Sequence, residues 1–181
     1  MNLAARILKW AGWKVEVSVP DYPKSIICVA PHTSNWDFIL CELAIRSIHR
    51  HAGFLMKSSW FFWPLGPIFR SMGGIAVNRK PGQSLTQHLI EMYRESDRLT
   101  IAITPEGTRS RTSKWHTGFL RVAYETGTPI CLAALDFPSK TISMNCTYEP
   151  TGDLDADMHA IKTFYRPYTG KYADKFSTED E

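Results

Sequence analysis

The sequence predicts an α/β fold: a single domain with a mixed, mostly parallel β-sheet flanked by helices. Strand-like apolar runs alternate with amphipathic, helix-like runs, which is typical of this class. A chain of 181 residues suits one domain and buries about 70% of the surface that unfolding exposes. No repeat or linker-like stretch interrupts it before a polar tail. We therefore divide the chain into an N-terminal segment (1–13), one domain (14–170) and the tail (171–181).

The N-terminal segment is predicted to form a short amphipathic helix. Leu3 and Ile7 share one face, which leaves Arg6 and Lys9 on the other. The segment is too short and too charged for a transmembrane helix or a secretory signal. Its two tryptophans favour contact with membrane headgroups. Packing onto its own domain is the open alternative.

The next two elements are a strand and a helix. The apolar run from Ser25 to Ala30 predicts a short buried strand. Ser34 or Asn35 is a good N-cap for a helix that continues to about His49.

His32 and Asp37 lie where this strand gives way to this helix. Residues five apart on a helix point about 140° away from each other, so the two side chains meet only if His32 lies in the preceding turn. The pair then suggests a catalytic base with its orienting carboxylate, at the strand end where open α/β sheets bind ligands. The alternative is structural, because Asp37 also fits a capping box with Ser34.

An aromatic segment follows at residues 60–69, with five aromatic residues in ten positions. Pro64 and Pro67 forbid a long helix there. The rings must fill the core, line an apolar groove or contact a membrane or partner, because an exposed aromatic patch promotes aggregation.

The rest of the chain continues the alternation of strands and helices. We expect the last two strands to form a hairpin at the sheet edge, and Gly127 to end the helix before them. The expected elements are strands at 74–78, 99–104, 129–136 and 140–148, and helices at 82–96, 117–126 and 153–165.

A second motif follows the strand at 99–104. It is the charged loop Pro105-Glu106-Gly107-Thr108-Arg109-Ser110. Two further stretches accompany the motifs in order. The first runs from Phe54-Leu55-Met56-Lys57 through Trp63-Pro64-Leu65-Gly66 to Gly73–Arg79, and the second is Gly127-Thr128-Pro129-Ile130.

These four ordered blocks resemble the glycerolipid acyltransferase family, which includes bacterial lysophosphatidic acid acyltransferase and glycerol-3-phosphate acyltransferase. Its signatures are His-x4-Asp and a Glu-Gly-Thr-Arg loop. The resemblance covers about residues 26–135 and implies a glycerol-3-phosphate acyltransferase-like fold. Thr104 stands where the family usually has an aromatic residue, and Ser58 where an acidic one is common. These departures leave the acceptor open.

The resemblance implies transfer of a fatty acyl group from acyl-CoA or acyl carrier protein to a hydroxyl of a glycerol phosphate or lysophospholipid. The expected acceptor is 1-acylglycerol-3-phosphate, and the place of action is the cytoplasmic face of a membrane, with peripheral attachment. His32 would be the general base, oriented by Asp37 as a histidine is in a Ser-His-Asp triad.

The acceptor's phosphate also needs a binding site. Arg109 is the preferred clamp, because guanidinium pairs bidentately with phosphate. Gly107 lets the backbone approach closely. Arg79 and Lys57 are further candidates, with Glu106 and Thr108 in the same loop.

Three of these residues have a structural alternative. Glu106 could pair with an arginine to shape the loop, Thr108 could satisfy the turn, and Arg79 could be a solvated surface residue.

Charge distribution bears on the partners. Basic residues number 21 and acidic ones 18, so the net charge is only +3, and eight of the 18 acidic residues lie in the last stretch, 149–181. The basic ones cluster around the motifs, which suits an anionic substrate or lipid surface. No nucleic-acid-binding module is present, so no nucleic-acid partner is expected.

Neither a metal nor a cofactor is expected; the acyl donor counts as a substrate. The cysteines lie far apart without a Cys-x-x-Cys pair, and the histidines other than His32 lack ligand spacing. We interpret the cysteines as buried hydrophobic residues, and the histidines other than His32 as surface or helix residues. The residues concerned are Cys28, Cys41, Cys131, Cys146, His49, His51, His88, His116 and His159.

A second function class stays open: a non-catalytic lipid-binding or membrane-docking protein of the same fold. A hydrolase is less favoured, because the sequence has no Gly-x-Ser-x-Gly elbow.

Overall fold

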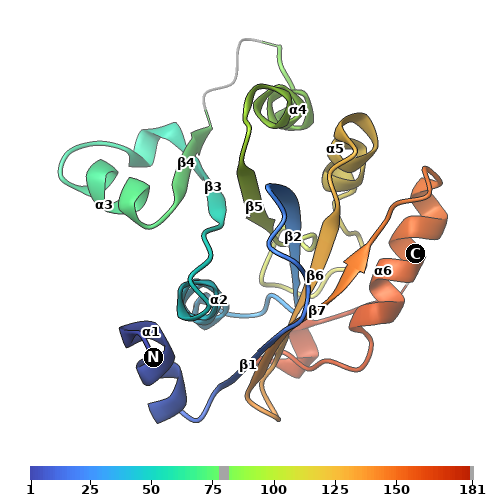
Figure 1. The fold of residues 1–181 in the computed structure, drawn as a ribbon. Coiled ribbons are helices and arrows are strands. Elements are labelled where there is room, and N and C mark those ends of the chain that lie inside the picture. The colour runs from blue at the N-terminus through green and yellow to red at the C-terminus, as the bar shows by residue number, and fades with distance from the viewer. Residues whose placement is uncertain (78–81, 180–181) are drawn as a thin grey trace.

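The computed structural model describes residues 1–77 and 82–179, which form an α/β domain around one seven-stranded sheet (Figure 1). The strand order is β1-β7-β6-β2-β5-β3-β4, and within the described residues only β6 and β7 pair antiparallel. The predicted fold class is confirmed. The strands are β1 (Lys14–Val17), β2 (Lys24–Ala30), β3 (Gly53–Lys57), β4 (Gly74–Val77), β5 (Leu99–Ile103), β6 (Ile130–Asp136) and β7 (Thr141–Tyr148).

Helices cover both faces of the sheet (Figure 1). Buried side chains of α1 and α2 pack on one face, and those of α4, α5 and α6 pack on the other. The helices are α1 (Leu3–Trp10), α2 (Asn35–Ser47), α3 (Leu65–Ser71), α4 (Leu85–Glu95), α5 (Gly118–Thr126) and α6 (Leu154–Tyr165), with short 3-10 turns at Ser58–Trp60 and Ala173–Lys175.

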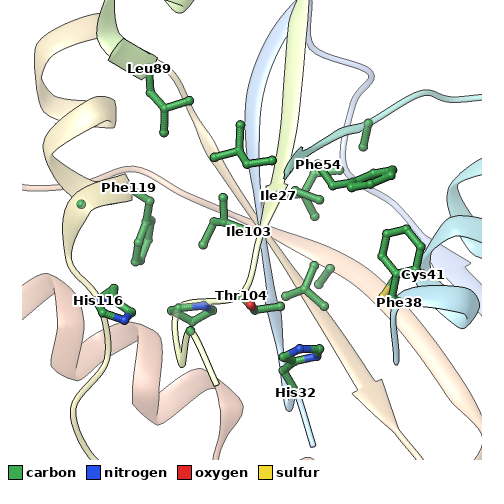
Figure 2. Close-up of a pocket in the computed structure, with 18 of the residues that line it drawn as sticks. Ile27, His32, Phe38, Cys41, Phe54, Leu89, Ile103, Thr104, His116 and Phe119 are labelled. Carbon is green, nitrogen blue, oxygen red and sulfur yellow. The ribbon is translucent and has the colours of Figure 1, made fainter. Parts of the chain in front are cut away.

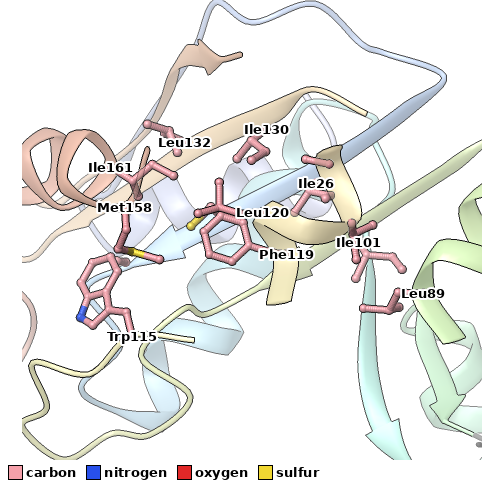
Figure 3. Close-up of a cluster of buried hydrophobic side chains, with 14 of the residues drawn as sticks. Ile26, Leu89, Ile101, Trp115, Phe119, Leu120, Ile130, Leu132, Met158 and Ile161 are labelled. Carbon is pink, nitrogen blue, oxygen red and sulfur yellow. The ribbon is translucent and has the colours of Figure 1, made fainter. Parts of the chain in front are cut away.

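The main core lies between the sheet and α4, α5 and α6. Strand β2 contributes Ile26 and Cys28 to it, while Ile27 and Val29 enter a second cluster on the opposite face. This alternation is the period of a strand covered on both sides. Figure 3 shows Leu120 of α5 among the side chains of this main core. Leu120 is fully buried, which is worth about 1.5–3 kcal/mol for a side chain of this size.

One prediction about the sheet edge is wrong. Strands β6 and β7 do form a hairpin, but β1 pairs parallel with β7 and takes the edge position. Strand β1 has only four residues, with exposed Lys14 and Glu16 alternating with half-buried Val15 and Val17. Such a short charged strand is a common way of covering an edge.

The sheet opens between β3 and β5. Two residue pairs join these strands within the described residues, Gly53 with Ile101 and Phe54 with Ala102. Strand β3 pairs with β4 over four residues instead. The unit of β3, β4 and α3 consequently stands apart from α4 in Figure 1.

The aromatic segment contains no long helix, as its prolines required. Helix α3 is seven residues long, with Pro64 at its N-cap and Pro67 in its first turn, where proline is tolerated. After α6 the chain turns back, and residues 166–179, which we call the C-terminal segment, pack against the domain. Across residues 1–77 and 82–179, no helix has the length and apolar character needed to cross a bilayer.

Candidate active site

His32 lies in the turn between β2 and α2, as the proposed geometry requires. Ser34 is the N-cap of α2, so His32 precedes the helix and stands at the carboxyl end of a central strand. Its Nδ1 lies 3.3 Å from Oδ2 of Asp37. The structure thus brings the two side chains together.

Asp37 also holds the start of the helix. Its Oδ2 accepts hydrogen bonds from the backbone N–H groups of Thr33 and Ser34, both at 2.7 Å, and its Oδ1 accepts one from Ser34 Oγ at 2.6 Å. The two interpretations made from the sequence are therefore compatible, because one carboxylate caps the helix and contacts the imidazole.

These bonds decide the charge of Asp37. Burial alone would raise its pKa, but hydrogen bonds from His32, Ser34 and Thr33 outweigh burial and lower the pKa. An ionised carboxylate only accepts hydrogen bonds, so the imidazole carries its proton on Nδ1. In the neutral form of this tautomer the lone pair is on Nε2, as a general base needs.

Glu106, in the loop after the neighbouring strand β5, bonds to the turn that carries His32. Its Oε1 accepts the backbone N–H of His32 at 2.6 Å. The side chain is 2% exposed, and its Oε2 has no partner in the described part of the chain. Burial raises the pKa of Glu106 to about 8; the bond from His32 opposes this and the charge of Asp37 adds to it. Burial thus favours the neutral form of this carboxyl, and Glu106 is not among the residues that line the groove beside His32.

A groove of about 1680 Å³ runs from His32 into the opening between β3 and β5. In Figure 2 the side chains of His32, Thr104 and His116 lie at one end, and Phe54 and Leu89 lie toward the other. Most of the labelled wall residues in that view are apolar. Such a groove suits a molecule with an aliphatic chain and one polar, reactive end.

Comparison with known proteins identifies the family and the fold. Residues 14–135 match the family model described as Acyltransferase. The chain belongs to the acyltransferase family. It is also similar in structure to the 1-acyl-sn-glycerophosphate (LPA) acyltransferase PlsC from Thermotoga maritima, with a TM-score of 0.59 and 18% identity, covering 89% of this chain and 74% of that one. That likeness shows a shared fold. No curated protein sequence matches the chain.

The remaining predicted site residues of this acyltransferase differ in what they contact. Arg109 is exposed, lines the groove and makes no hydrogen bond or ion pair within the described residues. Thr108 accepts the backbone N–H of Ser110 at 3.2 Å, which satisfies the turn. Arg79 and the side chain of Lys57 lie outside what the structure describes, so their roles stay predictions.

His116 is a groove residue that sequence reasoning missed. Its backbone N–H donates to the carbonyl of Pro105 at 2.7 Å, and its ring lies against Gly107. Gly107 has φ 63°, and a Cβ there would collide with the imidazole of His116. The sequence offered one weak signal, namely that His116 closes the loop that leads from β5 to α5.

The two departures from the family pattern lie at different places. Thr104 lines the groove between His32 and His116 (Figure 2). Ser58 begins the 3-10 turn after β3 and is exposed. Of the two, Thr104 is placed to influence which acceptor fits.

Proposed function

We infer that this acyltransferase moves a fatty acyl group from acyl-CoA or acyl carrier protein to a hydroxyl of a glycerol phosphate or lysophospholipid, with 1-acylglycerol-3-phosphate as its main acceptor. The observation that carries this proposal is the imidazole of His32, held through Nδ1 by an ionised Asp37 at the polar end of an apolar groove. Membership of the acyltransferase family supports it.

The proposed reaction uses these residues in order. Nε2 of His32 takes the proton of the acceptor hydroxyl while the oxygen attacks the thioester carbonyl. Asp37 stabilises the imidazolium that forms. The carbon–sulfur bond then breaks, and the imidazolium returns the proton to the departing thiolate. The products are an ester and a free thiol.

We assign the acceptor's phosphate to Arg109. Its guanidinium has no protein partner in the described residues and faces the groove that begins at His32. A planar, permanently charged group of this kind binds phosphate bidentately. Thr108, Gly107, Arg79 and Lys57 are the additional candidates for this site. For Glu106 we propose support of the His32 turn instead, because its carboxyl is buried and bonded there.

We also propose that the protein attaches peripherally to the cytoplasmic face of a membrane through α1, α2 and the segment 60–69. Arg46 of α2 bonds to residues next to the other two elements: its carbonyl accepts from Asn2, the N-cap of α1, and its guanidinium donates to the carbonyl of Ser71, the last residue of α3. They expose ten of the large apolar side chains: Leu3, Ile7, Trp10, Trp36, Phe38, Ile39, Trp60, Phe62, Trp63 and Ile68.

This surface combines rings with cations. Trp10 is 90% exposed and Trp63 is 85% exposed, while Leu8 of the same N-terminal helix is buried against the domain. Helix α1 also carries the exposed residues Arg6 and Lys9. Tryptophan and basic residues together favour the headgroup region of an anionic membrane.

The decisive experiment is release of free thiol from palmitoyl-CoA and from palmitoyl-acyl carrier protein, with a panel of phosphorylated and neutral acceptors. His32→Ala should lower the rate by about 10² to 10⁴. His51→Ala, an exposed histidine elsewhere, is the control. Thiol release that needs no acceptor, or that survives in His32→Ala, would contradict the transferase. Lipid binding without any transfer would favour the non-catalytic alternative.

Two further measurements test the binding surfaces. Arg109→Ala should raise KM for a phosphorylated acceptor far more than for a neutral one. Arg94→Ala, at an exposed arginine, is the control. An equal rise in KM for both acceptors would contradict binding of the phosphate by Arg109. Flotation with vesicles of phosphatidylcholine and phosphatidylglycerol tests the membrane surface. Trp10→Ala with Trp63→Ala should weaken flotation, whereas Leu85→Ala, an exposed apolar residue outside that surface, should not.

A further inference from the structure

The C-terminal segment contacts the turn that carries His32. Gly170 packs against Thr33, so that a Cβ on Gly170 would lie 2.7 Å from Thr33 Oγ1 and 2.8 Å from its Cγ2. The backbone N–H of Tyr172 donates to Thr33 Oγ1 at 3.3 Å. Thr33 is 1% exposed, so this contact fills the back of the turn.

Thr33 connects this contact to the proposed base. Its backbone N–H donates to Asp37 Oδ2 at 2.7 Å, and the same oxygen lies 3.3 Å from Nδ1 of His32. The C-terminal segment, Thr33, Asp37 and His32 thus form one continuous series of contacts. A shift of Thr33 would therefore be passed on to the carboxylate that contacts the imidazole.

The other end of the segment is tied to the chain that follows the Glu106–Arg109 loop. Trp115 Nε1 donates to the carbonyl of Ser177 at 3.2 Å, and Arg111 Nη1 donates to the carbonyl of Phe176 at 3.1 Å. Asp136 at the end of β6 accepts the backbone N–H of Thr169 at 3.0 Å. The segment therefore bridges the two loops that form the polar end of the groove.

We propose that the C-terminal segment, which lies beyond residues 14–135 of the family match, positions His32 for catalysis, with Gly170 and Thr33 as positioning residues. It touches no reacting atom. The inference rests on the proposed function of His32, and it adds a requirement that the two motifs do not contain.

A substitution at Gly170 tests the contact between Gly170 and Thr33. The φ of Gly170 lies outside the left-handed region, so alanine is compatible with the backbone there, and the obstacle is the close approach of Thr33 and Pro31. Gly170→Ala should therefore displace the His32 turn while the fold is kept. A misplacement of about 1 Å at a reacting group can cost 10² in rate.

In the thiol-release assay, Gly170→Ala should lower kcat by about tenfold or more and change KM by less than about twofold. Gly170→Ala combined with Thr33→Ala, which removes both colliding atoms, should recover the kcat of Thr33→Ala alone. The control is Gly152→Ala, at an exposed glycine with φ 96° and open space around it, which strains the backbone without approaching the turn. It should lower stability and leave kcat unchanged.

A measurement independent of activity separates this inference from the proposed function. The imidazole NMR signals of His32, assigned with His32→Ala, should move in Gly170→Ala while those of His51 stay. If wild type shows no transfer, the proposed function fails, and the NMR result still decides whether the segment holds the imidazole. Unchanged His32 signals in folded Gly170→Ala would overturn the positioning role, as would an unchanged kcat in an active enzyme.

Discussion

Replacing Glu106 by glutamine should make the protein more stable at alkaline pH relative to wild type. Glu106 is buried, and its Oε1 accepts the backbone N–H of His32. Glutamine has nearly the same shape, carries no charge at any pH and offers the same acceptor oxygen. The variant therefore imitates the neutral carboxyl that burial favours in the folded protein.

The magnitude follows from proton binding. In the unfolded chain the carboxyl loses its proton near pH 4.5, whereas in the folded protein burial keeps the proton up to about pH 8. The contribution of this group to wild-type stability is thus complete below pH 4.5 and decreases as pH rises toward 8, by about 1.4 kcal/mol per pH unit. Between about pH 5 and 8 the loss is at most about 4 kcal/mol, and relaxation around the charge reduces it.

The assay is urea unfolding of wild type and Glu106→Gln from about pH 5 to 8. The stability of the variant minus that of wild type should rise by more than about 1 kcal/mol across this range. Glu95→Gln, at an exposed carboxylate of α4, controls for removal of a negative charge. Transfer activity should persist in Glu106→Gln, because the His32 N–H keeps its acceptor. A difference that is constant with pH would refute the reasoning that burial holds this carboxyl neutral.

Two further predictions concern stability. Gly107→Ala should lower the free energy of unfolding more than Gly127→Ala, because both glycines have φ near 65° but only Gly107 faces a neighbouring ring. In urea unfolding, adding His116→Ala to Gly107→Ala should remove this extra loss of stability. Equal losses in the two glycine variants would contradict the contact. Burial opposes ionisation of Asp157, but hydrogen bonds from two tyrosine hydroxyls and from Thr151 lower its pKa to about 2. Asp157→Asn should lower the free energy of unfolding by about 1–3 kcal/mol near pH 7, and this difference from wild type should shrink as pH falls from 3.8 toward 2. A difference that does not change with pH would show that the ionised Asp157 carboxylate does not stabilise the fold.

Local features of the site could be predicted from the sequence. The approach of His32 to Asp37 depends on a strand end, one turn and a helix N-cap, all within a few consecutive residues. Gly127 ends α5 with φ 65°, as expected for a glycine C-cap. The predicted helix after Asn35 is slightly too long, because the chain leaves the helix at Ile48 and His49 takes a positive φ.

Contacts between distant segments could not be predicted. Glu106 reaches the amide of His32 only because β5 pairs with β2 in the register that places Ile103 beside Cys28. Alternating apolar runs do not specify strand order, and several orders satisfy the same pattern. The approach of His116 to Gly107 and that of Gly170 to Thr33 depend on the same tertiary arrangement.

The two roles of Asp37 link folding of α2 to formation of the proposed site. One carboxylate closes the first turn of α2 and fixes the ring of His32. Formation of that turn therefore also brings the carboxylate of the proposed catalytic pair beside the imidazole, and the contact of Gly170 with Thr33 then sets the final position of the ring. Substitution of Asp37 would remove both at once, and lost activity in such a variant could not be divided into a chemical part and a folding part.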